Sequence, residues 1–341
     1  MARESVTSHD VAKLAGVSQS AVSRVFRPGS SVSPQTIEKV RKAAEDLGYR
    51  PNVLARSLVT GRSRIIGLVV GYFHNFFYPE ALEKLSKQFQ EHGYHVLVFM
   101  ASQQEGTLDR VLDELLDYQV DGIVLASLAM SSDIAQRCAT AGIPVVLFNR
   151  SQDDDRLSAI TSDNYAGGWK LAKFLAAGEH RRISHVAGWP GASTQRDREA
   201  GFVAGLAASG LKLHAREEGN FDYEQAREAT HRLFARGNAP DAIFVANDHM
   251  AFSVLDTLRS ELGVRVPEDV SVVGYDDVVM AAWPSFNLTT VRQRSTRMVE
   301  EVVRVLFARI EDRHSPPQRI AIDGPLVIRG SARMPAAASA P

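Results

Sequence analysis

The chain has 341 residues, of which 45% are hydrophobic and 23% are charged, as is typical of a globular protein. This composition excludes a disordered or fibrous chain, and the length predicts more than one domain. Because Cys138 is the single cysteine, the chain can form no internal disulfide and no cysteine cluster for a metal. We expect neither a metal nor another cofactor.

The net charge of −1 hides an uneven distribution. Residues 1–64 carry 11 Lys and Arg against 5 Asp and Glu, whereas the remaining residues carry 28 against 35. A basic segment on an acidic body is expected of a chain that meets nucleic-acid phosphates at one end. The sequence contains no apolar stretch of about 18 residues and begins with no signal peptide. We therefore expect a cytoplasmic protein with no membrane contact.

The first helix of the basic segment has a clear start signal. Thr7 and Asp10 have the three-residue spacing of a capping box, in which each side chain binds the other residue's backbone N–H. Val11, Leu14 and Ala15 then follow the helical period and predict one apolar face.

Two more short helices are predicted before residue 50. Gly16 supplies a sharp turn and Ser18 caps the second helix, while the third begins at Ser33-Pro34 and ends before Gly48. One face of the second helix carries side chains suited to base edges in the major groove of DNA. These candidate DNA-binding residues are Gln19, Ser20, Ser23 and Arg24. The alternative is an ordinary helical bundle with a solvated polar face, and the charge distribution argues against it.

Four motifs resemble one protein family closely. They are residues 10–18 (DVAKLAGVS), 22–25 (VSRV), 47–52 (LGYRPN) and 54–58 (LARSL). Together they resemble the lactose-repressor (LacI/GalR) family of bacterial transcription regulators, and the similarity runs from about residue 6 to residue 331. The resemblance implies a helix-turn-helix head that binds double-stranded DNA.

The segment after the head has two interpretations. Asn52 can cap a helix of about two turns, which is too short to be stable alone in water. The resemblance implies a hinge helix that pairs with a second subunit, inserts Leu58 into the minor groove and approaches the DNA closely at Ala55. Arg56 is a candidate phosphate contact. The alternative, a plain basic linker, fits the sequence pattern equally well.

The body alternates apolar runs with helical stretches. The runs are residues 65–70, 94–99, 122–126, 144–149, 183–187, 242–246 and 270–274. Continuous apolar strands separated by helices predict parallel sheets that are covered on both faces. We therefore expect an α/β body of two doubly wound lobes, which resembles the type I periplasmic binding proteins.

The resemblance also implies how the chain is divided. We expect a helix-turn-helix head at 1–50, a hinge helix and linker at 51–64, and an effector-binding and dimerisation body at 65–331. Within the body, lobe 1 takes about 65–162 and 293–325, and lobe 2 takes about 163–292 and 326–331. We expect a flexible tail at 332–341.

Polar residues that follow the predicted strands are candidates for an effector site, because open α/β sheets bind ligands at the carboxyl ends of their strands. Asn149, Asn247 and Asp276 occupy such positions, and Phe77 belongs to an aromatic stretch after the first strand. That stretch, residues 72–78, departs from the Asn-Pro-Phe-Phe of the resembled family. The resemblance adds Arg198 as an effector-gripping arginine and Phe221 as a ring that stacks on the ligand.

Three acidic residues near predicted strands are given structural roles. We expect Asp163 to cap a helix near the first connection between the lobes. Asp248 and Asp277 are assigned to helix caps or contacts between the lobes rather than to the ligand.

Three classes of function compete. The favoured one is a repressor released from a palindromic operator by a sugar, sugar acid or polyol, for which hydroxyl-binding Arg, Asn and Asp side chains are suitable. A corepressor-type regulator that binds a purine is less favoured. The purine-binding branch of the resembled family has a second arginine six residues before the one that Arg198 matches, and this chain has Ala192 there. The second class, a sugar-binding protein without DNA activity, conflicts with the basic head. The third class is a doubly wound enzyme that uses a nucleotide; we do not expect an enzyme, because the sequence lacks the nucleotide-binding and catalytic motifs.

The C-terminal segment bears on the oligomeric state. Residues 334–341 (MPAAASAP) contain two prolines and no leucine, so they cannot form the leucine-heptad helix of tetrameric relatives. We expect a homodimer whose contact surface includes residues near 72–90 and 240–285.

Overall fold

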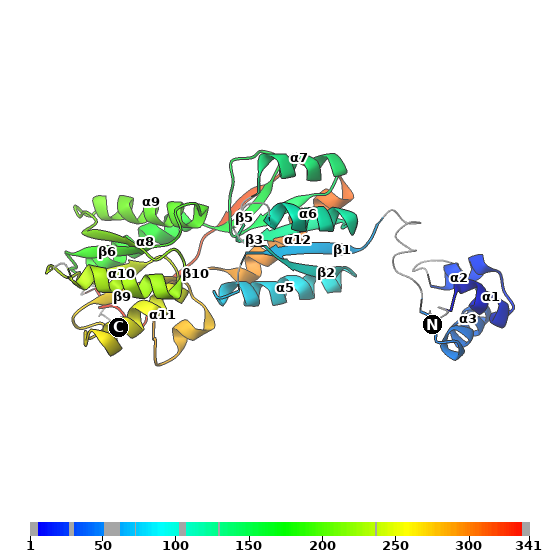
Figure 1. Cartoon of the computed structure of the whole chain (residues 1–341), viewed down its shortest axis with the longest axis horizontal. Helices are drawn as coiled ribbons and strands as arrows, with labels where there is room; N and C mark the ends of the chain where they lie inside the picture. Colours follow the sequence, from blue (N-terminus) through cyan, green and yellow to red (C-terminus); the bar gives the residue numbers. More distant parts are fainter. Residues whose placement is uncertain are drawn as a thin grey trace. The chain divides into compact units, whose positions relative to one another are not determined.

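The structure is a computed structural model that describes residues 6–26, 31–50, 62–71, 73–101, 107–128, 130–235 and 237–335. The chain divides into two compact units, residues 1–63 and residues 64–341. The first unit is a helical head and the second is the body (Figure 1).

The head contains helices α1 (Ser8–Ala15), α2 (Gln19–Val25) and α3 (Pro34–Asp46). The predicted capping box at α1 is confirmed: the Thr7 backbone N–H donates to Asp10 Oδ2 at 2.8 Å, and the Asp10 N–H donates to Thr7 Oγ1 at 3.4 Å. Gly16 ends α1 with a φ of 66°, a left-handed conformation that glycine adopts without strain. Ser18 and Ser33 cap α2 and α3 as predicted.

The core of the head forms around Val11, Val22 and Val40, which are buried. One predicted core residue is wrong, because Leu14 is 54% exposed. Ala12 is buried in its place. At 100° per residue, Val11, Ala12 and Ala15 share the face that meets α2 and α3, and Leu14 lies about 100° away from its centre.

The body contains two six-stranded sheets. In lobe 1 the strand order is β11-β5-β4-β3-β1-β2, and in lobe 2 it is β12-β10-β9-β8-β6-β7. All ladders are parallel except that between β10 and β12. The strands are β1 (Ile65–Val70), β2 (His95–Met100), β3 (Gly122–Ala126), β4 (Val145–Phe148), β5 (Ser158–Ser162), β6 (Ile183–Ala187), β7 (Ala215–Glu218), β8 (Ala242–Val245), β9 (Ser271–Asp276), β10 (Thr289–Arg292), β11 (Arg319–Ile322) and β12 (Leu326–Val327).

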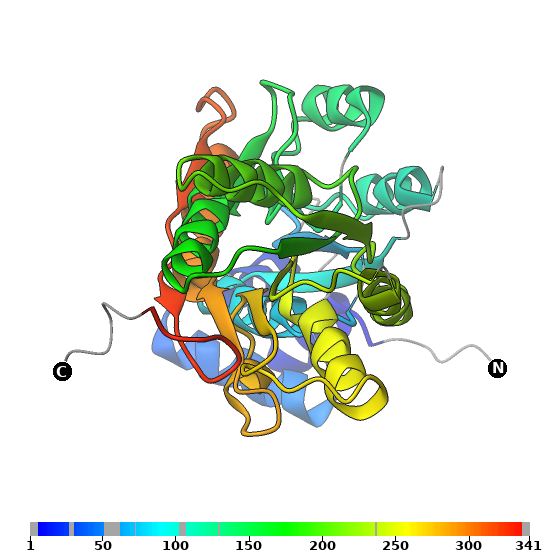
Figure 2. The ribbon, with the colours of Figure 1, turned by 90° about the vertical axis from the view of Figure 1, so that its left-hand side faces the viewer.

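Helices cover both faces of each sheet. In lobe 1, α5 and α12 pack together on one face and α6 and α7 lie on the other; in lobe 2, α8 and α9 cover one face and α10 and α11 the other (Figures 1 and 2). These helices are α5 (Phe77–Glu91), α6 (Thr107–Asp117), α7 (Ser132–Ala141), α8 (Asn164–Ala177), α9 (Ser193–Ala207), α10 (Tyr223–Ala235), α11 (Asp248–Asp256) and α12 (Ser295–Glu311). A π-helical segment η1 (Thr257–Glu261) continues α11, and a 3-10 helix η2 (Val279–Ala282) follows β9.

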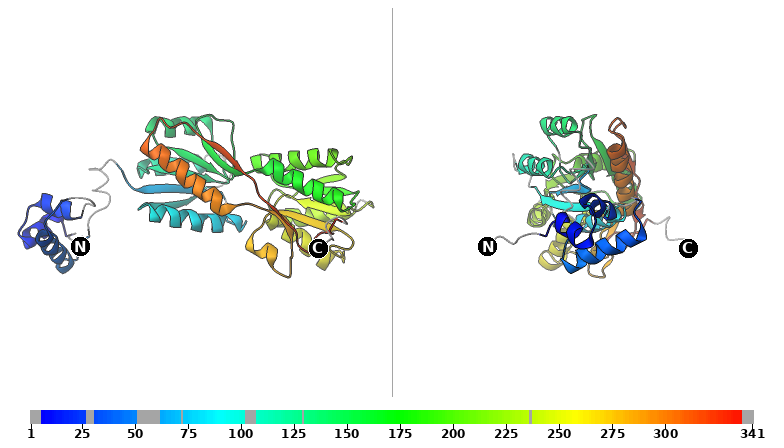
Figure 3. Two further views of the ribbon diagram at one scale, coloured as in Figure 1. Left: turned by 180° about the vertical axis from the view of Figure 1, so that it is seen from behind. Right: turned by 90° about the vertical axis from the view of Figure 1, so that its right-hand side faces the viewer.

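The chain passes between the lobes three times. It crosses between β5 and α8, between β10 and α12, and between β11 and β12. The last crossing follows from the sheets, since β11 belongs to lobe 1 and β12 to lobe 2. Figure 3 shows the orange helix α12 on lobe 1 and the strands that join it to lobe 2. These crossings are the segments that a change of angle between the lobes must bend.

Three further features concern the ends and the interior of the body. Ala332 and Arg333, assigned to the tail by the sequence, are packed on lobe 2: Ala332 is buried, and the Arg333 guanidinium lies 2.7 Å from His180 Nδ1. Cys138 is buried in the core of lobe 1. Across the described ranges, no helix is both long enough and apolar enough to cross a membrane.

Candidate functional site

Strained backbone marks the edge where the strands of the two lobes end. Ser127, Asn149 and Asp276, at or just beyond the ends of β3, β4 and β9, have φ values of 67°, 57° and 129°. Phe221, which follows β7, has a φ of 61°. Positive φ is costly for residues with a Cβ, above all for an aromatic one, and such strain gathers at functional sites.

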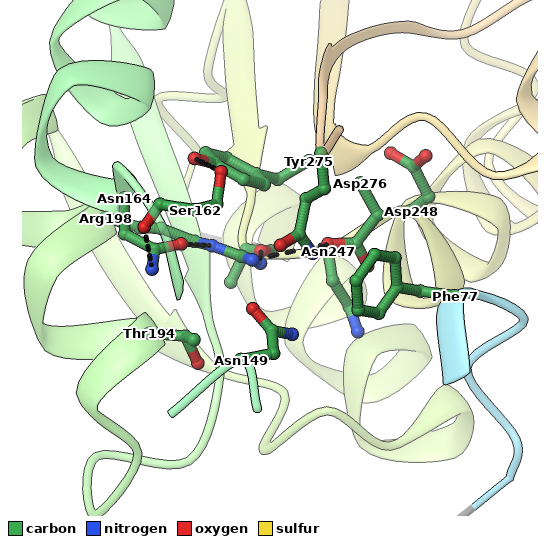
Figure 4. A network of polar contacts seen from close by, with 12 residues as sticks. Phe77, Asn149, Ser162, Asn164, Thr194, Arg198, Asn247, Asp248, Tyr275 and Asp276 are labelled. Atoms are coloured by element: carbon green, nitrogen blue, oxygen red, sulfur yellow. Dashed lines mark hydrogen bonds and ion pairs between the residues drawn. The ribbon is translucent and has the colours of Figure 1, made fainter. Parts of the chain in front are cut away.

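A buried ion pair lies at the centre of this edge (Figure 4). Arg198 of α9 and Asp276 of β9 are 2% and 3% exposed, and Arg198 Nη2 lies 3.3 Å from Asp276 Oδ1. The guanidinium lies over the Tyr275 ring at 3.7 Å from its centroid, and Nη1 donates to the Ala246 carbonyl at 2.6 Å. Burial raises the pKa of Asp276, while Arg198 and hydrogen bonds from Asn75 and Gln293 oppose that rise.

Two crossings between the lobes are bonded to this pair. Arg198 Nε donates to Asn164 Oδ1 at 2.8 Å, where the first crossing enters α8. Gln293 Nε2, in the second crossing, donates to Asp276 Oδ1 at 2.6 Å. A ligand that moves either member of the ion pair therefore acts directly on the segments that join the lobes.

The sequence assigned Asn247 to the effector site and Asp248 to a helix cap or a contact between the lobes, and the structure differs in part. Asn247 is the cap of α11, with its Oδ1 accepting from the Met250 N–H at 3.0 Å. Its Nδ2 is buried with no hydrogen-bond partner among the described residues. Asp248 is not a cap, contrary to expectation: it accepts from Val278 N at 3.0 Å and from Thr290 Oγ1 at 2.6 Å, both within lobe 2.

Asp248 and Asp277 lie in different surroundings. Burial, followed by the neighbouring charge of Asp276, raises the pKa of Asp248 to about 8. Asp277 was also assigned to a cap or a contact between lobes, and this prediction is wrong because its carboxylate pairs with Arg292 at 2.5 Å and Arg329 at 2.6 Å inside lobe 2. Asp163 does cap α8, as predicted.

Lobe 1 contributes an amide and an aromatic ring. Asn149 Nδ2 donates to the Tyr78 hydroxyl at 3.1 Å, and Asn149 Oδ1 is buried without a partner in the described part of the chain. Phe77 is 4% exposed and stacks on Phe148 with ring centroids 5.9 Å apart. Phe77 also lines a cavity of about 610 Å³ together with Asp276 and Gln293.

Direct hydrogen bonds hold the two lobes together across the site. Asn75 Nδ2 of lobe 1 donates to Asp276 Oδ2 at 2.8 Å. Arg150, also in lobe 1, donates from Nη1 to Thr194 Oγ1 of α9 at 3.0 Å. Phe221 packs against Gly188, where a Cβ would lie 2.2 Å from the ring, and lies 5.8 Å from the Arg150 guanidinium.

In the head, the candidate DNA-binding side chains share the exposed face of α2. Gln19, Ser20, Ser23 and Arg24 are all exposed. Gln19 Nε2 donates to Ser8 Oγ at 2.9 Å, which fixes the amide at the junction of α1 and α2. The remaining candidates, Asn52, Ala55, Arg56 and Leu58, lie outside the described residues.

Known proteins resemble the chain over nearly its whole length. Residues 7–52 match the family "Bacterial regulatory proteins, lacI family", and residues 172–332 match the "Periplasmic binding protein-like domain". The HTH-type transcriptional regulator CelR of Thermobifida fusca is 34% identical, with 96% of this chain and 99% of CelR covered. The chain belongs to the lacI family of bacterial regulatory proteins.

Two further relatives of this lacI-family protein are informative. The HTH-type transcriptional repressor PurR of Pasteurella multocida is 29% identical, with 96% of this chain and 98% of PurR covered. The lac repressor dimer bound to operator and the anti-inducer ONPF has a TM-score of 0.87 and 27% identity, with 96% of this chain and 99% of that chain covered. The lacI-family fold of head and two parallel-sheet lobes is therefore shared.

Sequence reasoning missed several polar residues of this lacI-family site. Gln293 is the first residue after β10, a strand whose sequence TTVR has no continuous apolar run to reveal it. Asn75 and Asn164 lie in a loop and at a helix start, and only the fold brings them to Asp276 and Arg198. Arg150 is the second residue after β4, and this place just beyond a strand end was its one signal in the sequence.

Proposed function

We propose that this lacI-family protein is a repressor that binds a palindromic operator as a homodimer and is released by a small polyhydroxylated effector in the cleft between the lobes. The observation that carries the proposal is the buried Arg198–Asp276 pair, which is bonded to two crossings between the lobes. Such a regulator would act in the cytoplasm, where bacterial DNA lies.

The chemistry of the cleft supports a ligand rich in hydroxyl groups. Asn149 Oδ1 and Gln293 Oε1 are buried acceptors, and Asn247 Nδ2 is a buried donor; none has a partner among the described residues. A buried polar atom without a hydrogen bond is unfavourable, and the hydroxyl groups of a ligand can donate to both acceptors and accept from the donor. The Asn75–Asp276 hydrogen bond would give way to a ligand hydroxyl.

The crossings offer a mechanism for release. A ligand changes operator affinity only by its differential affinity for two states of the protein, typically by about 1 to 3 kcal/mol. Because Asn164 and Gln293 bond to the ion pair, a ligand on Arg198 and Asp276 would alter the angle at which the lobes meet. The change would reach the heads through the segment at 51–64.

The exposed face of α2 supports a role in reading operator sequence. Gln19, Ser20, Ser23 and Arg24 have the side chains that bind base edges in the major groove. One head covers one half-site, and two heads related by symmetry require a two-fold symmetric operator. In this proposal, Asn52, Ala55, Arg56 and Leu58 add contacts at the centre of the operator.

The proposal is tested with Asp276→Asn. We expect the variant to bind operator DNA, selected from a random library by the wild type, with an affinity within about threefold of the wild type. Its effector response should need an effector concentration at least about tenfold higher, because hydrogen bonds to a charged group are lost. Fluorescence anisotropy of labelled operator measures both quantities, with ligands drawn from sugars, sugar acids, polyols, sugar phosphates and purines.

The matched control is Asp269→Asn, which removes the carboxylate of an exposed Arg–Asp pair with Arg265 on the same lobe. This control should respond like the wild type. A wild-type response in Asp276→Asn would refute the proposed cleft. An effector that tightens operator binding would instead make the protein a corepressor-type regulator.

A further inference from the structure

The buried charged residues of the body differ in whether an ion pair balances their charge. Within the described ranges, six Asp, Glu, Lys or Arg side chains belong to residues that are less than a tenth exposed: Arg150, Asp154, Arg198, Asp248, Asp276 and Glu301. Four of them form ion pairs. Asp154 pairs with Arg156 at 2.6 Å, Arg198 with Asp276 at 3.3 Å, and Glu301 with Arg297 and Arg304 at 2.8 and 2.7 Å. Asp248 and Arg150 are the two of these six that form no ion pair within the described ranges.

These two residues differ in how they can avoid an unpaired charge. A buried carboxylic acid can keep its proton, and burial raises the pKa of Asp248 to about 8. A guanidinium stays charged in proteins. Arg150, which is 5% exposed, therefore carries a full positive charge away from water.

The neighbours of Arg150 are neutral. Nη1 donates to Thr194 Oγ1 at 3.0 Å and Nη2 donates to Ser127 Oγ at 3.2 Å, and the Phe221 ring lies 5.8 Å away. In the part of the chain that the structure describes, Arg150 forms no ion pair with a carboxylate. Hydroxyl groups and an aromatic face offset only part of the cost of burying a cation.

The adjoining backbone adds to the positive potential. Thr194 lies in the first turn of α9, a helix of 15 residues whose cap, Ala192, has no side chain to accept from the first N–H groups. The N-terminus of a helix carries a partial positive charge and attracts anions. The Arg150 guanidinium therefore lies beside this helix end, where it contacts Thr194.

We propose that the effector is an anion: a polyhydroxylated small molecule whose carboxylate or phosphate group binds Arg150 beside the N-terminus of α9. This inference rests on the proposed effector-controlled function. Asn149, next to Arg150 in the chain, has the buried acceptor for a neighbouring hydroxyl. The anionic group supplies the negative counter-charge that Arg150 lacks, and the hydroxyl groups serve the buried polar atoms of Asn247 and Gln293 that have no partner among the described residues.

The experiment compares ligands that share one carbon skeleton and differ in charge. For each pentose and hexose skeleton, the aldose, the alditol, the aldonate and the terminal sugar phosphate are added at equal ionic strength to the full-length protein. Thermal shift gives binding, and anisotropy of labelled operator gives release. We expect the best ligand to be an anion that binds at least about tenfold more tightly than its neutral counterpart. Whether the best anion is the aldonate or the phosphate identifies the anionic group.

Three variants test the role of Arg150. Arg150→Gln should reduce the preference for the anion to less than about threefold, and Arg150→Lys should retain part of it because the charge remains. The matched control Arg196→Gln removes an exposed arginine of α9 that donates to the Gly191 carbonyl at 3.1 Å, and it should keep the wild-type preference. Without ligand, Arg150→Gln should melt no lower than wild type, since an unpaired buried charge has been removed.

The outcomes separate this inference from the proposed function. A neutral sugar that binds as tightly as its acid and releases operator would overturn the anionic effector and leave the proposed function intact. An anion that binds through Arg150 and leaves operator affinity unchanged would support the anion site and contradict the proposed function. If no sugar derivative binds, inorganic phosphate is the probe, and equal stabilisation of wild type and Arg150→Gln would overturn the inference.

Discussion

At the scale of single residues, Asp248 shows how burial sets a charge. Its carboxyl is surrounded by the Val278 N–H, the Thr290 hydroxyl and two further acids, Asp276 and Asp277. Two donors favour the ionised form, but burial and the neighbouring negative charges outweigh them and raise the pKa to about 8 from a usual 3.8. The folded protein therefore holds a proton here that the unfolded chain releases at a much lower pH.

This difference predicts how stability depends on pH. A raised pKa in the folded state means that the contribution of Asp248 to the free energy of unfolding falls as pH rises from about 4 to about 8 and then levels off. Asp248→Asn should remove that fall. Between pH 6 and pH 9, we expect the wild type to lose at least about 2 °C of Tm relative to the variant, which corresponds to roughly 1 kcal/mol for a unit of this size. Calorimetric profiles that run parallel would contradict the prediction.

Arg24 gives a second prediction at this scale. If its guanidinium binds a guanine in the major groove, Arg24→Ala should cost about 1 to 3 kcal/mol at one base pair and relax the preference there. Arg41→Ala, an exposed arginine of α3, is the control and should leave the sequence preference unaltered. A binding selection from random DNA gives both preferences. An unaltered preference in Arg24→Ala would remove it from the recognition set.

At the scale of elements, some strands could be predicted from the sequence and others could not. The seven apolar runs are all strands, with ends displaced by at most two residues. Five strands have no such run: β5, β7, β10, β11 and β12. β7 and β11 are edge strands, whose exposed sides admit charged residues, and β12 has only two residues.

The difference between predicted and unpredicted strands also explains which residues of the site could be anticipated from the sequence. Asn149, Asn247 and Asp276 follow or end strands that were predicted, so their place in the cleft could be anticipated. Gln293 follows a strand that was not predicted. Asn75 reaches Asp276 over a separation of 201 residues, and only the packing of the lobes determines such a contact. Whether Asn247 or Asp248 caps α11 depends on where α11 begins, and the sequence predicts that position only to within a few residues.

Coupling through the first crossing gives a prediction at the element scale. Asn164→Ala removes the acceptor of Arg198 Nε. We expect the ratio of operator affinities without and with effector to fall by about twofold to tenfold, while operator binding without effector changes little. Asn238→Ala, on an exposed loop, is the control. An unchanged ratio in Asn164→Ala would mean that this crossing carries no coupling.

At the scale of the whole molecule, exposed apolar side chains mark the surfaces on which the second copy of the proposed homodimer would bind. β2 is an edge strand with Val98 and Met100 exposed by 53% and 49%. In lobe 2, Val279 and Trp283 are 65% and 49% exposed, within the predicted contact range 240–285. Unpaired edge strands and clustered apolar side chains are unfavourable in water and are usually covered by a partner.

The proposed dimer is therefore tested with charges on both surfaces. Met100→Asp combined with Val279→Asp would bury two carboxylates in the contact and should produce monomers at micromolar concentration in sedimentation velocity. Operator affinity should fall at least about tenfold, because two heads held together bind two half-sites far more tightly than separate heads. The control Val203→Asp places a charge on α9, where the side chain is 42% exposed, and should leave the dimer intact. If the double variant stays dimeric and keeps its operator affinity, the subunits meet through another surface.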